Sequence, residues 1–311
     1  MASYAINENF LQQLETLELI LKNNVAGLFG GNHQSKKFGS SCEFADHREY
    51  MAGDDITKIN WNLYARTENL YLKQYLDERR LKTKIYLDAS LSMDFNKSNK
   101  AVLALQIAAA FAYLSIVLMD KASIYIIKDN MCYEVIHEMA NKDSFYTDIM
   151  KLNTIEFSGD FKFSEAIMKE DVGYGDGLSI IISDFLTEND YQVGLDRLVD
   201  KKRDVLCVQL LSKEEVKPTI RGKIHYFDSE LSSSDYRKNV NKDVYKAYLE
   251  AVNYVKNNLK NLCASRGANY VFMQDDKNIK DTFINMFIEE GVLKWVLLIL
   301  LDYLDLSVFQ S

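Results

Sequence analysis

Three oxygen-bearing side chains stand at alternate positions after one short apolar stretch. Asp88, Ser90 and Ser92 follow the apolar residues 85–87. A carboxylate and two hydroxyls form an all-oxygen set, which suits a hard divalent ion and above all Mg²⁺, because Mg²⁺ keeps several waters and takes few protein ligands. The alternative is that Ser90 or Ser92 only caps the next helix. The spacing predicts a candidate metal site, with helix capping left open.

The elements on either side determine where these side chains would lie. Residues 85–87 are apolar and partly β-branched, as in a buried strand, and residues 98–119 form an apolar stretch of helical length. Ligand sites in open α/β sheets lie at the carboxyl ends of strands. The order strand, loop, helix therefore places the three side chains at such an end.

From residue 84 onward, strand-like and helix-like segments alternate. Apolar strands that alternate with helices are typical of a mostly parallel sheet covered on both faces. We therefore expect an α/β fold with a doubly wound, mostly parallel sheet and helices on both faces. The expected strands are residues 122–127, 131–136, 178–183, 205–211, 224–227 and 269–273, and the expected helices are residues 143–152, 163–169, 190–201, 240–266 and 279–289.

The first 80 residues differ in character. Residues 10–29 have apolar positions at helical spacing, and residues 30–41 are polar with glycines, which predicts a helix followed by a loop. Residues 43–66 are rich in charge and aromatics without a clear period, whereas residues 69–75 alternate as a strand would. A segment of mixed structure is expected before the sheet.

Length, charge and cysteines limit the classes of function. The chain has 311 residues, 48% of them hydrophobic, and can bury one large core with or without a smaller unit. Its formal net charge is −8 and its lysines are scattered, which argues against nucleic acid as a partner, since that needs a basic stripe. Four separated cysteines form no CxxC pair, and residues 1–10 lack the features of a signal peptide. We expect a cytoplasmic protein.

Two apolar segments approach the length of a membrane span. Residues 101–119 are rich in alanine and lie between two predicted strands, so burial against the sheet is the better interpretation. Residues 292–304 are too short to span a bilayer and contain Asp302. For this C-terminal tail, packing on the domain, docking on a partner and peripheral contact with a membrane all stay open.

The residues around Asp88 resemble the metal-ion-dependent adhesion site of von Willebrand factor A domains. The resemblance lies in residues 88–92, which read DASLS, and in residues 182–185, which read ISDF. It implies that Ser90 and Ser92 bind Mg²⁺ (or Mn²⁺) directly, and that Asp88 and Asp184 reach the ion through water.

The same resemblance requires a threonine in a later loop. In this chain residues 157–161 read FSGDF and contain no threonine. Ser158 and Asp160 are the candidates to replace it. An acid bound directly to the ion would make the site more negative, and the site would then attract a partner's carboxylate less strongly.

An upstream block resembles the signature of the domain-of-unknown-function-58 family. It reads F-x-D-x-R-x-Y-x-x-G-D-D over residues 44–55, followed by INW at residues 59–61 and by AR at residues 65–66. The match covers residues 40–290, and the family usually has an acid where Asn60 stands. Those bacterial proteins carry an A-like domain and are associated with MoxR-type AAA+ ATPases, so the resemblance implies such an ATPase as the partner.

The charged and aromatic residues of the upstream block have two interpretations. They form either a docking surface or a brace for the metal-bearing domain, or else a structural network of buried Arg–carboxylate pairs that replaces a core. We favour the structural network. The residues concerned are Asp46, Arg48, Asp54, Asp55, Trp61 and Arg66.

An enzyme of the haloacid-dehalogenase type is the rival to a binding module. Such phosphoryl-transfer enzymes also have an acid at the end of the first strand, but they need a second acid two residues later as the proton donor. Ser90 occupies that position. We therefore predict a non-catalytic, metal-dependent protein-binding module with three parts: residues 1–82 (N-terminal helix and mixed family-signature segment), 83–290 (A-like domain) and 291–311 (apolar tail).

Overall fold

The computed structural model contains two compact units, and each is described by itself. The sheet unit comprises residues 1–24 and 81–293, and the signature unit comprises residues 25–80 and 294–311. This division differs from the predicted one in that the first 24 residues group with the sheet. The described residues are 5–28, 38–51, 54, 56–76, 81–94, 99–175, 177–186, 191–218, 222–227, 235–240 and 242–275. The predicted helix 279–289 and the apolar tail lie outside them.

The sheet unit is built on six strands in the order β10–β7–β6–β3–β4–β5. Every neighbouring pair is parallel except β4 and β5, which are antiparallel. The predicted α/β fold with a mostly parallel sheet is therefore confirmed. The strands are β3 (Lys82–Asp88), β4 (Lys121–Lys128), β5 (Met131–Met139), β6 (Leu178–Ser183), β7 (Asp204–Leu211) and β10 (Asn269–Gln274).

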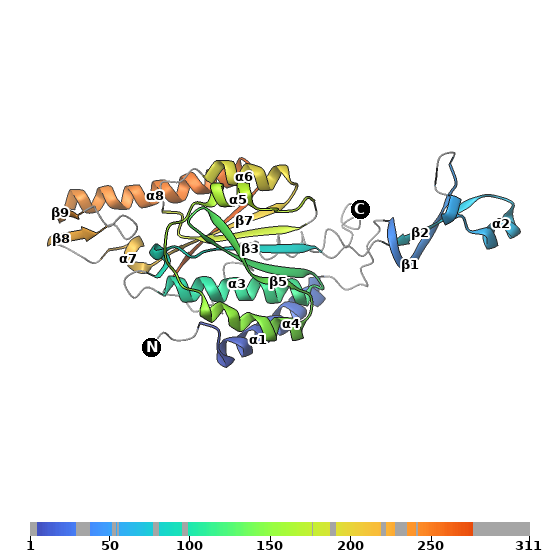
Figure 1. The fold of residues 1–311 in the computed structure, drawn as a ribbon, viewed down its shortest axis with the longest axis horizontal. Helices are drawn as coiled ribbons and strands as arrows, with labels where there is room; N and C mark the ends of the chain where they lie inside the picture. The colour runs from blue at the N-terminus through green and yellow to red at the C-terminus, as the bar shows by residue number, and fades with distance from the viewer. Residues whose placement is uncertain are drawn as a thin grey trace. The chain divides into compact units, whose positions relative to one another are not determined.

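Helices cover both faces of this sheet (Figure 1). The first, third and fourth helices lie on one face, and the fifth, sixth and eighth lie on the other. Strand β6 is buried at every position, as a strand covered on both faces must be. The helices are α1 (Glu8–Leu28), α3 (Lys100–Val117), α4 (Lys142–Asp148), α5 (Phe163–Lys169), α6 (Tyr191–Asp200), α7 (Lys213–Val216) and α8 (Lys242–Ala264), with 3₁₀ turns η2 (Leu91–Asp94) and η3 (Ile149–Thr154).

Helix α3 is the apolar helix that follows the candidate site. By length and composition it is long and apolar enough to cross a membrane, with a mean hydropathy of 1.8, but 83% of it is buried inside the protein. Ala104, Ala108 and Ala112 are fully buried, and their small side chains allow the helix to lie close to the sheet. The expected burial of this segment against the sheet is confirmed.

Helix α1 is attached to the sheet unit by buried polar contacts. The side-chain amide of Asn153 donates to the carbonyl of Ile6 and accepts from its N–H, each at 2.9 Å, so it pairs with this residue as a strand would. The Tyr113 hydroxyl donates to the Glu18 carboxylate at 2.5 Å. Lys142 donates to the same carboxylate oxygen at 2.6 Å. These bonds join the N-terminal residues to α3, α4 and η3.

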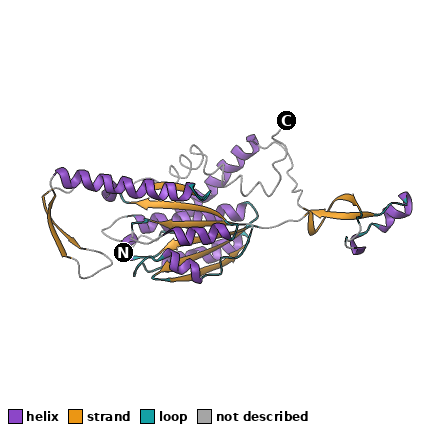
Figure 2. Ribbon diagram, turned by 90° about the horizontal axis from the view of Figure 1, so that it is seen from above, coloured by secondary structure: helices purple, strands orange, loops and turns teal. Residues whose placement is uncertain are grey.

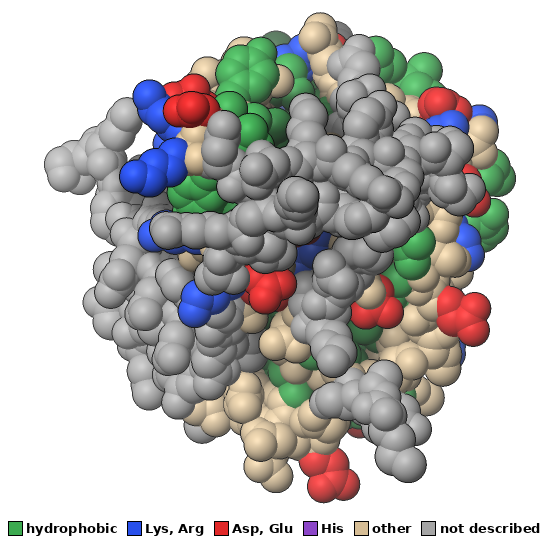
Figure 3. Space-filling model, turned by 90° about the vertical axis from the view of Figure 1, so that its left-hand side faces the viewer, with side chains coloured by type: hydrophobic (Ala, Val, Ile, Leu, Met, Phe, Trp, Pro, Cys, Tyr) green, Lys and Arg blue, Asp and Glu red, His purple; other side chains and the backbone are tan. Residues whose placement is uncertain are grey.

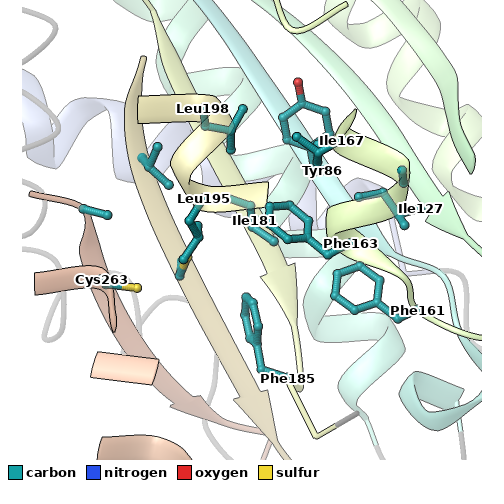
Figure 4. Packing of buried hydrophobic residues seen from close by; sticks show 14 of the residues in the cluster. Tyr86, Ile127, Phe161, Phe163, Ile167, Ile181, Phe185, Leu195, Leu198 and Cys263 are labelled. Carbon is teal, nitrogen blue, oxygen red and sulfur yellow. The ribbon is translucent and has the colours of Figure 1, made fainter. Parts of the chain in front are cut away.

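Aromatic side chains fill the core beneath two loops of the sheet unit (Figure 4). Phe185 lies edge-on to Phe161, with ring centroids 6.4 Å apart, and edge-on to Tyr191 at 5.1 Å. Phe163 stacks beside Phe161 at 6.1 Å. Because Phe161 and Phe185 directly follow Asp160 and Asp184 in the chain, this cluster anchors the end of the loop before α5 and the start of the loop after β6.

A two-stranded hairpin lies apart from the six-stranded sheet. Strands β8 (Gly222–Phe227) and β9 (Asp235–Val240) pair with each other and project beside the start of α8 (Figures 1 and 2). The predicted strand at residues 224–227 is thus present but is not part of the sheet. The predicted helix start at residue 240 is wrong, since Val240 ends β9 and the helix begins at Lys242.

The signature unit contains a second two-stranded ribbon. Strand β1 (Phe38–Glu49) pairs antiparallel with β2 (Tyr71–Leu76), and a 3₁₀ turn η1 (Ile56–Lys58) and helix α2 (Trp61–Thr67) lie between them in the chain. The predicted strand at residues 69–75 corresponds to β2. Strand β1 was not expected, because its sequence has no apolar alternation and its pairing register shifts twice.

Candidate functional site

The candidate residues lie at the point where the strand order of the sheet reverses. Asp88 is the last residue of β3, and Asp184 directly follows β6, the neighbouring strand. The chain leaves β3 towards β4 on one side, whereas β6 and β7 extend the sheet on the other. Ligands of open α/β sheets bind at this kind of switch point, outside the carboxyl ends of the strands.

Asp88 organises the loop that follows its strand. Its carboxylate is fully buried and accepts a hydrogen bond at each oxygen, from the Ser90 N–H at 2.8 Å and from the Ser183 hydroxyl at 2.6 Å. Burial, and then the negative charge of Asp184, raises the pKa of the Asp88 carboxyl. Ser183 is a site residue that sequence reasoning did not single out, although it lies in the ISDF motif.

Two serine hydroxyls lie beside this carboxylate. The Ser90 and Ser92 Oγ atoms are 3.1 Å apart, and the Ser92 hydroxyl donates to Asp184 Oδ2 at 2.9 Å. An octahedral Mg²⁺ holds its oxygen ligands at about 2.0–2.1 Å, which places neighbouring ligands about 3 Å apart. The two hydroxyls therefore fit adjacent positions around one such ion.

Asp184 is saturated with donors. Its Oδ1 accepts from the Leu186 N–H at 3.1 Å, and its Oδ2 accepts from both Ser92 and the Lys100 ammonium, each at 2.9 Å. The side-chain amide of Gln209 in β7 donates to its backbone carbonyl at 2.8 Å. Both carboxylate oxygens of Asp184 therefore accept hydrogen bonds within the protein.

Lys100 is part of the site and was not anticipated. Its side chain is 1% exposed, and its ammonium donates to Asp184 and, at 2.7 Å, to Glu215 Oε1. Burial alone would lower the pKa of Lys100, but these two carboxylates outweigh it and raise that pKa above the usual lysine value. A signal was present in the sequence: a lysine in the first turn opposes the helix dipole, so it needs a partner.

The loop expected to carry a threonine lies against the site through its backbone. The Ser158 N–H donates to the Ala89 carbonyl at 2.8 Å, and the Leu91 N–H donates to the Gly159 carbonyl at 3.2 Å. Gly159 has a φ of +77°, and a Cβ there would lie 2.5 Å from Asp129 Oδ1. The loop therefore requires glycine at this position.

Of the two residues proposed to replace the threonine, Ser158 bonds to the site loop through its backbone N–H. Asp160 Oδ1 accepts from the N–H of the next residue, Phe161, at 2.9 Å, and the Asp160 backbone pairs with Asp129. The structure thus brings together Asp88, Ser90, Ser92 and Asp184, places the Ser158 backbone beside them, and turns one oxygen of Asp160 towards its own backbone.

Other kinds of metal site find no counterpart in the described part of the chain. Among the described residues, no group of three or more His, Cys, Asp or Glu side chains is arranged to hold a metal ion. Cys207 and Cys263 are fully buried free thiols, and Cys132 is partly exposed. An ion at the sheet edge would depend on the serine hydroxyls.

The motif residues of the signature unit form a different kind of surface. Arg48 and Asp54 form an ion pair at 2.8 Å whose side chains are 42% and 23% exposed, so the favoured buried network is wrong for this pair. The Asn60 side chain accepts from the Leu63 N–H at the start of α2 and lies 2.6 Å from His47 Nε2. Gly53 and Asp55 lie outside the described residues.

Several solved structures and curated proteins are similar to this chain. An aerotolerance-related membrane protein of Bacteroides fragilis is 12% identical, with a TM-score of 0.38, over 69% of this chain and 97% of that chain. A von Willebrand factor type A protein of Catenulispora acidiphila is 13% identical, with a TM-score of 0.34, over 46% of this chain and 35% of that chain. The uncharacterized protein Rv1480 of Mycobacterium tuberculosis is 26% identical over 225 residues, 70% of each protein.

The family profile described as "Protein of unknown function DUF58" matches residues 46–255, which is more than half of the chain. The matched part contains the signature block from Asp46 onward, the DASLS and ISDF motifs and the strands that carry them. The chain therefore belongs to the DUF58 family, as the resemblance predicted.

Proposed function

We propose that this chain is a non-catalytic protein-binding module that holds a divalent ion, Mg²⁺ or Mn²⁺, at the carboxyl end of β3. The observation that carries the proposal is the hydroxyl pair of Ser90 and Ser92, 3.1 Å apart and flanked by Asp88 and Asp184. When bound, the ion would supply an open coordination position for an acidic side chain of a partner protein.

Each residue has its own part in this proposal. Ser90 and Ser92 would hold the ion directly, because hydroxyl ligands are neutral and leave its charge available to a partner. Asp88 orients the loop through the Ser90 N–H. Asp184 orients the Ser92 hydroxyl from the opposite side. Ser158 is the nearest substitute for the missing threonine, since its backbone bonds to the site loop.

The proposed partner is a MoxR-type AAA+ ATPase, with this chain as its adaptor in the cytoplasm. Family membership supports this choice of partner. On the face in Figure 3, acidic and basic side chains of the described residues are interspersed, which suits a protein partner better than nucleic acid. Peripheral membrane contact through residues 292–304 stays an alternative for a segment outside the described residues.

The rival function, phosphoryl transfer of the haloacid-dehalogenase type, would make Asp88 the nucleophile. Both oxygens of that carboxylate accept hydrogen bonds inside the protein, and its side chain is fully buried. Ser90 stands where the proton donor would be needed. Metal-dependent phosphatase turnover that Asp88→Asn abolishes would favour the enzyme over the binding module.

The proposal is tested by measuring how the purified chain binds a MoxR-type ATPase in Mg²⁺ and in EDTA. We expect binding in Mg²⁺ only, and loss of that binding in Ser92→Ala. Ser115→Ala is the control, because Ser115 is a serine of the same sheet unit that bonds to Thr83 at the other end of β3. Equal binding in EDTA, or equal binding by both variants, would contradict the proposal.

A further inference from the structure

A buried ammonium lies beside the proposed ion position. Lys100 opens α3, and its charge lies within two hydrogen-bond lengths of the Ser92 hydroxyl, since both donate to Asp184 Oδ2 at 2.9 Å. A buried cation is costly unless it is paired and hydrogen-bonded. Lys100 meets both conditions without any ion, so the site contains a positive charge of its own.

The ammonium is held from a second side by a fixed carboxylate. Glu215 Oε1 accepts from Lys100 at 2.7 Å, while Glu215 Oε2 accepts from the Ser212 N–H at 2.7 Å. The Ser212 hydroxyl in turn accepts from the Glu215 N–H, which completes a capping box at α7. The Glu215 carboxylate is therefore oriented by its own turn, and it holds the Lys100 ammonium beside Asp184.

We propose that Lys100 is a built-in cation that sets the ligand preference of this site. This inference rests on the proposed function and deepens it. Lys100 neutralises Asp184 and occupies its Oδ2, so the site attracts a divalent ion less strongly than its two buried aspartates suggest. The ion that does bind keeps more of its charge and therefore attracts the carboxylate of an acidic partner more strongly.

The physical reason is the sign of each interaction. A fixed positive charge repels a metal cation and attracts a carboxylate, and both effects are large for groups a few ångströms apart in a buried site. Removal of this charge should therefore change the two affinities in opposite directions. A lysine with a purely structural role would weaken both or neither.

The test compares Lys100→Met with the wild-type chain in two titrations. Mn²⁺ binding is measured by calorimetry, and carboxylate binding to the Mn²⁺-loaded protein is measured with fluoroacetate, whose ¹⁹F relaxation reports its distance from bound Mn²⁺. We expect Lys100→Met to bind Mn²⁺ at least about tenfold more tightly and fluoroacetate at least about threefold more weakly. Lys121→Met is the control. Lys121 is the first residue of β4 and pairs with Glu138 of β5.

A second variant covers the case in which Lys100→Met fails to fold. Lys100→Met/Asp184→Asn removes one charge of each sign, so we expect its Mn²⁺ affinity to stay within about threefold of wild type. A loss of tenfold or more would mean that Asp184 binds the ion itself and would overturn the proposal. Equal or weaker Mn²⁺ binding by a folded Lys100→Met would also overturn it.

The two proposals fail separately. If wild type binds no Mn²⁺ but Lys100→Met does, the metal-dependent function is lost and the role of Lys100 as the internal cation is supported. If wild type binds Mn²⁺ and Lys100→Met binds it equally well, the proposed function survives and the inference about Lys100 is wrong.

Discussion

The two motif-bearing regions of this chain differ in where their motif residues lie. In the sheet unit, Asp88, Ser90 and Asp184 are fully buried and bonded to one another or to neighbouring strands. In the signature unit, Trp61 is 61% exposed and Arg48 is 42% exposed. Helix α2, all of whose residues are described, buries none of them.

A motif can keep its residues because they stabilise the fold or because they bind a partner, and the difference in burial separates these two cases. Substitutions in the buried motif should lower stability, because each leaves a polar group without its partner. Substitutions in the exposed motif should leave stability almost unchanged. Their effects should appear in binding instead, which makes the signature unit a candidate docking surface and favours the alternative that the sequence ranked second.

The largest expected effect sharpens this comparison at the buried site. In metal-free buffer, Lys100→Met leaves the Asp184 carboxylate buried without its cation, which should lower the free energy of unfolding by about 3–5 kcal/mol. Urea denaturation measures it. Lys213→Met, at an exposed lysine of α7, should change stability by less than about 0.5 kcal/mol. Similar losses of unfolding free energy in Lys100→Met and Lys213→Met would mean that the buried ion pair is no more important for stability than an exposed lysine.

A second test compares two tyrosines that both donate to glutamates of α1. The Tyr113 hydroxyl bonds to Glu18 inside the protein, whereas the Tyr146 hydroxyl bonds to Glu15 at the surface. Tyr113→Phe should cost about 1.5–3 kcal/mol, because it removes a hydrogen bond to a buried charged group. Tyr146→Phe should cost less than about 1 kcal/mol. Thermal unfolding of both variants would contradict this order if Tyr146→Phe were the more destabilising.

A third test uses pH on a surface ion pair of the sheet unit. Hydrogen bonds from Lys121 and then Lys82 lower the pKa of Glu138 from 4.5 to about 2. The stabilisation is therefore present above pH 4.5 and is lost as the pH falls towards 2. Because the carboxylate is 26% exposed, we expect a loss of only about 0.5–1 kcal/mol. Urea denaturation at pH 7 and pH 3 measures this loss of unfolding free energy. Wild type should show it, and Glu138→Gln should not.

The smallest expected change in stability lies in the signature unit. Trp61→Ala removes an exposed ring that lies edge-on to Tyr64 at 6.1 Å, and it should change the free energy of unfolding by less than about 0.5 kcal/mol. Binding to a MoxR-type ATPase should nevertheless weaken if this surface docks a partner. A stability loss above about 2 kcal/mol would place Trp61 among the structural residues and break the comparison.

The sequence predicted the sheet well because its strands are continuous apolar runs. Strands β3 and β6 are recognisable in this way, and the acids that end or follow them mark the edge of the sheet. Strands β1 and β9 carry polar sequences, FGSSCEFADHRE and DYRKNV, and they pair only in two-stranded ribbons. Neither sequence has the apolar alternation that identifies a strand.

The site was predictable in its oxygen ligands but not in its internal cation. Asp88, Ser90 and Ser92 lie within five residues of one another in the sequence. The loop at the end of one strand is therefore enough to bring their side chains together. Lys100 reaches Asp184 and Glu215 across 84 and 115 residues of chain. Only the crossover of α3 brings these groups together, so the sequence indicates that a lysine in the first turn needs a partner but not which residues provide it.

A calorimetric titration of metal-free protein with Mg²⁺ and Mn²⁺ measures most directly whether Ser90 and Ser92 hold a divalent ion. We predict saturable binding by wild type and by the Ser115→Ala control, and at least about a tenfold loss of affinity in Ser90→Ala, since one direct ligand is removed. Identical titrations of wild type and Ser90→Ala would contradict the account.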